Sequence, residues 1–146
     1  MKPPFPGDDP RVWEAVEGDG IPENPDGRRI MVVEDDPPIR EVLVTTLRLA
    51  GFRVASAPDG PSAMGVARAF KPELVLMDLM LPGIDGWSLT RQFMAEPDLG
   101  RPPIIVLSAK VREADRDKAL EAGAVEFLPK PCRAADLLRA IRENLD

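Results

Sequence analysis

The sequence predicts an α/β fold in which five successive βα units build one open parallel sheet. From Arg28 onward, short runs of β-branched and aliphatic residues alternate with longer amphipathic runs. The length of 146 residues, with 44% hydrophobic and 30% charged side chains, suits a single globular domain. Strands are expected over 29–33, 52–55, 73–77, 103–107 and 125–128, and helices over 37–50, 60–70, 86–95, 112–122 and 133–144.

The first expected helix has start and stop signals at both ends. Asp36 can cap its amino terminus, Pro37 suits its first position, and Gly51 ends it. One face of this helix is apolar and is expected to pack against the sheet. That face consists of Ile39, Val42, Leu43, Thr46, Leu47 and Ala50.

The later helices differ in how much apolar surface they offer. The second opens at Asp59-Gly60-Pro61, and the helix over 112–122 is so rich in charge that we expect it to be the least firmly docked. No second domain is expected after the last helix. The inward residues expected are Ala63, Met64, Ala67 and Phe70 in the second helix, and Leu137, Leu138, Ile141 and Leu145 in the last.

The sequence predicts an acidic, proline-rich extension over residues 1–27 and a folded domain over residues 28–146. The extension holds seven acids, two bases and six prolines without a sustained apolar period, so we expect it to be flexible. Its apolar cluster is Val12, Trp13 and Val16. Two interpretations stay open: a solvated leader whose Trp13 at most rests on the domain, or a short segment that binds a partner.

Composition excludes several functions. The chain has no histidine and a single cysteine, Cys132, so the usual zinc sites, catalytic triads and internal disulfides are not possible. No apolar run is long enough for a membrane span or has the setting of a secretory signal, so we expect a cytoplasmic protein without membrane contact. After residue 27 there are 18 acids and 17 bases, and direct nucleic-acid binding is therefore not expected.

Polar side chains follow four of the expected strands. They are Glu34-Asp35, Asp78, Ser108 and Lys130. Because ligands bind outside the carboxyl ends of strands in open parallel sheets, we expect these side chains to share one crevice. Their combined formal charge of −2 would be neutralised by Mg²⁺, which prefers oxygen ligands. With that charge neutralised, Asp78 can act as a nucleophile toward phosphorus.

Each of these residues also has an ordinary structural explanation. Asp36 before a proline is expected to be only a helix cap, and Ser108 or Lys130 alone would be unremarkable at a strand end. Asp78 is harder to explain in this way, because a carboxylate within an apolar run costs desolvation energy unless it is paired. The joint placement of the residues is what indicates a site.

Four segments resemble the receiver domain of two-component response regulators. The match covers about residues 29–146, with every motif in order. The segments are Met31-Val32-Val33-Glu34-Asp35-Asp36, Leu76 to Gly86 around Asp78, Val106-Leu107-Ser108-Ala109-Lys110, and Ala122-Gly123-Ala124 with Phe127-Leu128-Pro129-Lys130-Pro131. The resemblance implies a flavodoxin-like, doubly wound (βα)5 three-layer sandwich with strand order 2-1-3-4-5.

The resemblance also implies a function. Asp78 would be phosphorylated by a sensor histidine kinase or a histidine phosphotransferase. Mg²⁺ would be held by Asp35, by Asp78, by the backbone carbonyl of Met80 and, through water, by Glu34. The protein would then signal to a downstream protein, as a monomer or as a dimer that forms on phosphorylation.

The phosphoryl group is expected to change the shape of the domain. Ser108 would move toward it, Lys130 would pair with its oxygens, and Phe127 would turn inward. The responding face would be built from 112–122, 125–128 and 133–144. The Lys130–Pro131 bond is a candidate for the cis form.

The sequence departs from the family pattern at three places. Phe127 has no hydroxyl group, so packing alone would have to stabilise an inward state. The acidic extension is not part of the pattern, and Cys132 stands where a bulky apolar residue is common, so we expect it to be a small buried hydrophobe without redox function.

Three other functions compete with the phosphorylated receiver. The chain could be a constitutive interaction module with the same fold, although no member of the site is missing. It could be an aspartyl-phosphate phosphatase, but Met80 stands where a haloacid-dehalogenase type enzyme needs its second acid. A flavodoxin would need a hydroxyl-rich phosphate loop, where this chain has acids. We therefore expect a signalling protein and not an enzyme.

Overall fold

The computed structural model describes residues 27–81, 83–109 and 112–145, so the extension up to Asp26 lies outside the described residues. The strands are β1 (Arg29–Val33), β2 (Arg53–Ala57), β3 (Leu74–Asp78), β4 (Ile104–Ser108) and β5 (Glu126–Pro129). The helices are α2 (Pro37–Leu49), α3 (Gly60–Phe70), α4 (Gly86–Ala95), α5 (Glu113–Glu121) and α6 (Ala134–Asn144), with a short 3₁₀ helix, η2, at Pro97–Leu99.

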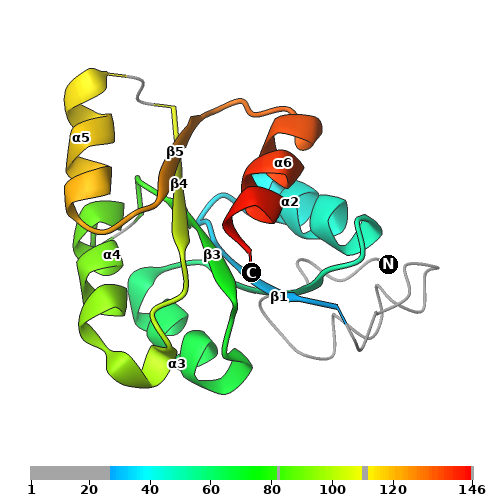
Figure 1. The fold of residues 1–146 in the computed structure, drawn as a ribbon, viewed down its shortest axis with the longest axis horizontal. Coiled ribbons are helices and arrows are strands. Elements are labelled where there is room, and N and C mark those ends of the chain that lie inside the picture. The colour runs from blue at the N-terminus through cyan, green and yellow to red at the C-terminus, as the bar shows by residue number, and fades with distance from the viewer. Residues whose placement is uncertain (1–26, 82, 110–111, 146) are drawn as a thin grey trace.

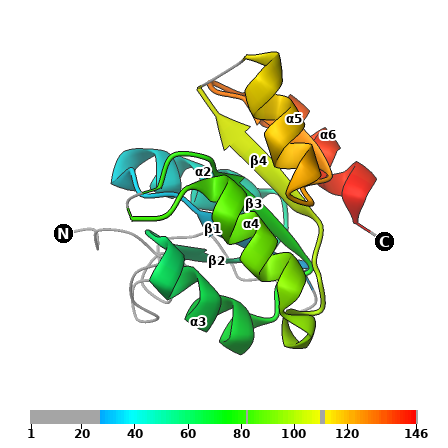
Figure 2. The same ribbon diagram turned by 90° about the vertical axis from the view of Figure 1, so that its left-hand side faces the viewer.

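The five strands form one parallel sheet in the order β2-β1-β3-β4-β5, which confirms the predicted order. Figure 1 shows α2 and α6 on one face of this sheet and α3, α4 and α5 on the other, and in Figure 2 α3, α4 and α5 face the viewer. The result is the expected three-layer, doubly wound sandwich.

Each face of the sheet has its own apolar core. Under α3, α4 and α5, Phe93 and Leu89 pack with Met31 and Val106, among others. Under α2 and α6, the core is aliphatic except for Phe52, which is 9% exposed. Since β3 and β4 are buried along their whole length, any polar side chain at their carboxyl ends sits at the rim of a dry interior.

The buried face of α2 differs from the predicted one. Val42 is 63% exposed and Ile39 is 39% exposed, while Leu47 is fully buried as expected. Arg40 and Arg48 are buried with Val44 and Leu47, at a spacing of i, i+4, i+7 and i+8. The predicted face did not include the two arginines, although the aliphatic stem of arginine packs well against apolar neighbours.

Aspartates set three of the helix starts, and the Asp36 cap confirms the one predicted from the sequence. Asp36 caps α2, Asp59 caps α3 and Asp85 caps α4, each accepting a hydrogen bond from the backbone N–H three residues later. Neither α5 nor α6 has a side-chain cap of this kind. The aspartate caps fix where α2 and α4 leave the sheet edge that carries the polar residues.

Helix α5 has the small buried face that its composition predicts. Only Asp115 and Ala119 of this helix are buried. Trp87 Nε1 on α4 donates a hydrogen bond of 3.4 Å to the Asp115 carbonyl, and Lys118 Nζ lies 4.8 Å from the Trp87 ring. These contacts with α4 therefore help to hold α5, whose own apolar face is small. No helix among the described residues is long and apolar enough to span a membrane.

Candidate functional site

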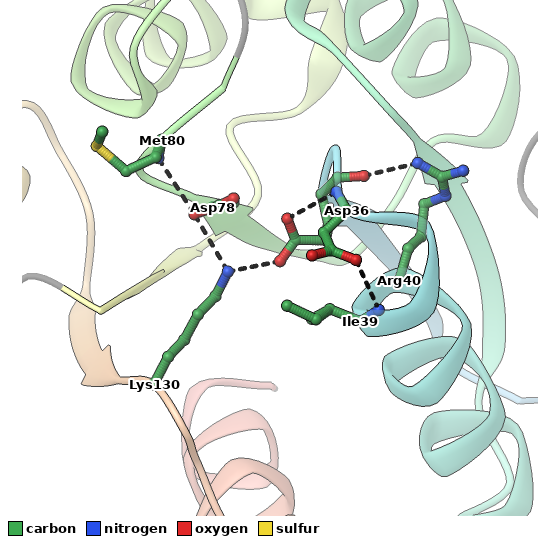
Figure 3. Close-up of polar contacts among 7 residues, drawn as sticks. Asp36, Ile39, Arg40, Asp78, Met80 and Lys130 are labelled. Carbon is green, nitrogen blue, oxygen red and sulfur yellow. Dashed lines mark hydrogen bonds and ion pairs between the residues drawn. The ribbon is translucent and has the colours of Figure 1, made fainter.

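The polar residues that follow the strands meet at one edge of the sheet. Asp78 is the last residue of β3, Ser108 is the last residue of β4, and Lys130 directly follows β5. The register pairs Asp78 with Leu107 and Ser108 with Pro129, so the three strands end side by side. Figure 3 shows Lys130 reaching from β5 toward Asp78 across this edge.

Three carboxylates form a compact cluster at this edge. One oxygen atom from each of Glu34, Asp35 and Asp78 lies within 4.8 Å of the others. Glu34 is 1% exposed and Asp78 is 5% exposed, whereas Asp35 is open to solvent. An all-oxygen donor set with one solvent-facing member fits Mg²⁺, which keeps several waters when it binds proteins.

Lys130 brings a positive charge to these carboxylates. Its Nζ donates a hydrogen bond of 2.5 Å to Glu34 Oε1 and lies 3.3 Å from Asp78 Oδ1. The backbone N–H of Lys130 donates to the Ser108 carbonyl at 2.8 Å, and the Lys130–Pro131 peptide bond is cis. The ammonium thus bridges the nucleophile and one of the expected metal ligands.

The start of α2 holds Glu34 in place. The Asp36 backbone N–H donates to Glu34 Oε2 at 3.2 Å, and the buried Arg40 Nη1 donates to the Glu34 carbonyl at 2.8 Å. The role of Arg40 was not predicted from the sequence. A signal existed in its spacing, since Arg40 lies one helical turn before Val44 and two before Leu47 on the same face.

The cluster shifts the proton affinity of its members. Burial raises the pKa of Glu34, and Asp78 raises it further, against the lowering effect of Lys130. Loss of hydration and then the neighbouring Glu34 raise the pKa of Asp35. Burial acts to lower the pKa of Lys130, but the Glu34 and Asp78 carboxylates outweigh it and raise that pKa. The site therefore favours a bound cation or an added proton.

The segment after β3 approaches Asp78 closely. The Met80 backbone N–H donates to Asp78 Oδ1 at 3.1 Å, while the Met80 side chain is 53% exposed. A Cβ atom on Gly86 would lie 2.7 Å from the Asp78 carbonyl and 2.7 Å from Leu79 Cα. Gly86 is required there because the first turn of α4 packs directly on the backbone that carries Asp78.

Three further predicted residues lie around this edge. Ser108 is fully buried, and Phe127 is 6% exposed and packs in the core under α3, α4 and α5, so its ring already points inward in this structure. Arg116 lies 5.8 Å from that ring. Cys132 is partly buried against the other core, and burial raises the pKa of its thiol, which fits the expected apolar role.

The family model for the response regulator receiver domain matches residues 30–142. Among curated proteins, the DNA-binding response regulator MtrA of Mycolicibacterium smegmatis is 39% identical over 118 residues, which cover 81% of this chain and 50% of MtrA. The transcriptional regulatory protein CseB of Streptomyces coelicolor is 41% identical over 120 residues, which cover 82% of this chain and 50% of CseB. The chain thus spans about half the length of these curated relatives.

Solved structures show the same fold. The receiver domain of the sensor histidine kinase PA1611 from Pseudomonas aeruginosa, which carries a magnesium ion in its active-site cleft, superposes with a TM-score of 0.74 at 37% identity, covering 81% of this chain and 97% of that one. The BeF3-activated receiver domain of Klebsiella pneumoniae RstA gives a TM-score of 0.75 at 32% identity, with coverage of 80% and 97%.

Proposed function

Because the chain belongs to the response regulator receiver family, we propose that Asp78 accepts a phosphoryl group from a histidine kinase or a histidine phosphotransferase in a two-component phosphorelay. The convergence of Glu34, Asp35 and Asp78 within 4.8 Å, with the Lys130 ammonium 3.3 Å from Asp78 Oδ1, is the observation that supports this most. We further propose a cytoplasmic location, and no contact with nucleic acid, since residues after 27 carry no basic surplus.

In the proposed transfer, a carboxylate oxygen of Asp78 attacks the phosphorus atom of a phosphohistidine. The new O–P bond forms as the P–N bond breaks, and the leaving imidazole keeps the electron pair and takes up a proton. Mg²⁺, held by Asp35, Asp78, the main-chain carbonyl of Met80 and, through water, Glu34, would neutralise the charge that builds up on the phosphoryl oxygens. Lys130 and Ser108 donate hydrogen bonds to those oxygens once transfer is complete.

We propose that the phosphoryl group then acts on the surface formed by α5, β5 and α6. Lys130 currently contacts Glu34, and a phosphoryl group on Asp78 would compete for this ammonium and pull on the end of β5. Phe127 belongs to that strand, and the weakly docked α5 packs beside it. To change the ratio of active to inactive domain from 1:99 to 99:1, phosphorylation has to favour the active state by about 5.5 kcal/mol. A downstream protein would bind the altered surface.

The test is intact-mass measurement after incubation with Mg²⁺ and a small phosphodonor such as acetyl phosphate. We expect one phosphoryl group on the wild type, none on Asp78→Asn, and none on the wild type when the metal is chelated. Asp85→Asn is the matched control, because Asp85 is an exposed carboxylate nearby and asparagine also caps helices. Failure of the wild type to gain mass would favour a constitutive interaction module instead.

A further inference from the structure

A groove of about 580 Å³ lies at the amino-terminal edge of the sheet, opposite the edge that carries Asp78. It is lined by the start of β1, by residues that precede β1, β3, β4 and β5, by part of η2 and by Asn144 at the end of α6. Its charged lining residues are Arg28, Arg29, Lys71, Arg101, Glu73 and Asp98, which give this groove a formal charge of +2.

The two carboxylates of the groove are already engaged. Glu73 forms an ion pair with Arg28 at 2.6 Å and with Arg29 at 3.6 Å, and the backbone N–H of Arg29 also donates to it. These contacts lower the pKa of Glu73 although burial opposes them. Asp98 pairs with Arg68 on the neighbouring helix α3 at 3.3 Å. Neither carboxylate is therefore available to the remaining cations of the groove.

Lys71 and Arg101 are those remaining cations. Both are exposed, and within residues 27–81, 83–109 and 112–145 no carboxylate lies at ion-pair distance from either. Both also adopt positive φ values, 54° for Lys71 and 47° for Arg101, a backbone region where glycine or asparagine is the usual choice. The chain thus presents two cations from positions where a smaller, uncharged residue would fit the backbone better.

The segment attached to this groove is strongly acidic. Residues 1–26 carry seven carboxylates and two basic side chains, a formal charge of −5. They join the domain at Gly27, next to the groove residue Arg28. The acids are Asp8, Asp9, Glu14, Glu17, Asp19, Glu23 and Asp26.

We propose that the acidic segment 8–19 docks in this groove of its own chain, with its carboxylates pairing with Lys71 and Arg101. Seven residues lie between Asp19 and Gly27, and the eight steps from one Cα to the next can span up to about 28 Å, so tether length does not prevent the contact. Because the segment is covalently attached beside the groove, docking is intramolecular and benefits from a high effective concentration. The segment would cover the sheet edge far from Asp78, so phosphorylation should not depend on it.

Zero-length cross-linking of the full chain tests this docking. A carbodiimide joins a carboxylate to a lysine amine only when the two are in contact, and peptide mass spectrometry identifies the pair. We expect Lys71 to be linked to Asp8, Asp9, Glu14, Glu17 or Asp19 in low salt. Glu23 and Asp26 lie too close to Arg28 in sequence to be informative. The exposed Lys118 on α5 is the reference lysine and should give few such links.

Charge variants and salt complete the experiment. Arg101→Glu should reduce the Lys71 links severalfold, whereas Arg91→Glu, at an exposed position of α4, should not change them. Salt at 1 M, which shortens the screening length to about 3 Å, should also reduce them severalfold. Circular dichroism checks that both variants fold. Links no more frequent than at Lys118, links insensitive to Arg101→Glu, or links only between copies in a mixture of labelled and unlabelled protein would each overturn the proposal.

Discussion

Lys130 and Glu34 form an ion pair of 2.5 Å across 96 positions of sequence, and the same ammonium lies 3.3 Å from Asp78. Both partners of this pair are largely withdrawn from solvent, with side chains 20% and 2% exposed. The lysine thus neutralises part of the acidic cluster. A cation that enters the site has to share these carboxylates with Lys130. A phosphoryl group on Asp78 would instead compete with the carboxylates for the Lys130 ammonium.

Magnesium is expected to stabilise the folded protein, because the cluster of three carboxylates exists only in the folded chain. At a free concentration one hundred times the dissociation constant, the gain in unfolding free energy is about 2.7 kcal/mol. Thermal unfolding across a Mg²⁺ titration measures it. Asp35→Asn should lose most of the gain, whereas Asp98→Asn, away from the site, should keep it. Equal stabilisation of both variants would argue against the site.

Replacing Lys130 by methionine is expected to strengthen Mg²⁺ binding while weakening the metal-free fold. The ammonium repels a second cation, and its removal leaves buried carboxylate charge without its partner, at a cost of about 1–3 kcal/mol. Thermal unfolding across a Mg²⁺ titration checks the first effect, and urea unfolding without metal checks the second. Arg91→Met, which removes a positive charge at an exposed position of α4, is the control and should change neither quantity. Weaker Mg²⁺ binding in Lys130→Met would show that the lysine supports the metal site.

Glu34→Gln is expected to stabilise the metal-free protein near neutral pH. Burial and Asp78 raise the pKa of Glu34 above its ordinary 4.5, so the folded chain holds this proton more tightly than the unfolded chain. At a pH above the raised pKa, the wild type therefore has a lower free energy of unfolding than Glu34→Gln. That difference should shrink as the pH falls through the raised pKa toward 4.5. Urea unfolding of both proteins from pH 7 to 4 tests it, and a gap that widens on acidification would contradict the sign.

Gly86→Ala is expected to destabilise the domain by about 1–3 kcal/mol, because the new methyl group would meet backbone atoms of Asp78 and Leu79 at 2.7 Å. The backbone of Asp78 and Leu79 cannot move away as a flexible side chain could. Gly65→Ala is the control: nothing lies within 4 Å of its Cβ position on α3, so it should stabilise the helix by about 0.5–1 kcal/mol. Similar effects of the two substitutions would mean that α4 does not pack tightly against the end of β3.

The sequence predicted the features that follow from local pattern. The parallel βα units, the Asp36 cap and the end positions of Asp78, Ser108 and Lys130 depend on alternation, turn residues and the geometry of parallel sheets. The strand order was implied by the resemblance to the receiver family. The buried arginine Arg40 and the exposed Val42 were not predicted, because they depend on which way α2 rotates against the sheet. That rotation is set by tertiary contacts, including the hydrogen bond from Arg40 to the Glu34 carbonyl.

The contacts of Lys130 could not be predicted from the sequence either. Its place at the end of β5 was predictable, but its choice of Glu34 at 2.5 Å over Asp78 at 3.3 Å depends on side-chain geometry at the sheet edge. The backbone N–H of Asp36 and the start of α2 orient Glu34 for that contact. A sequence pattern has no access to such differences of less than 1 Å.

The most direct test of the account is chemical mapping of the phosphorylated residue. Borohydride reduces an aspartyl-phosphate to homoserine, so treatment of the protein after exposure to Mg²⁺ and a phosphodonor leaves a permanent mark at the acceptor. We predict homoserine at position 78 and at no other aspartate. Homoserine at Asp35, or no homoserine in protein that has gained phosphoryl mass, would contradict the assignment of Asp78 as the phosphoacceptor.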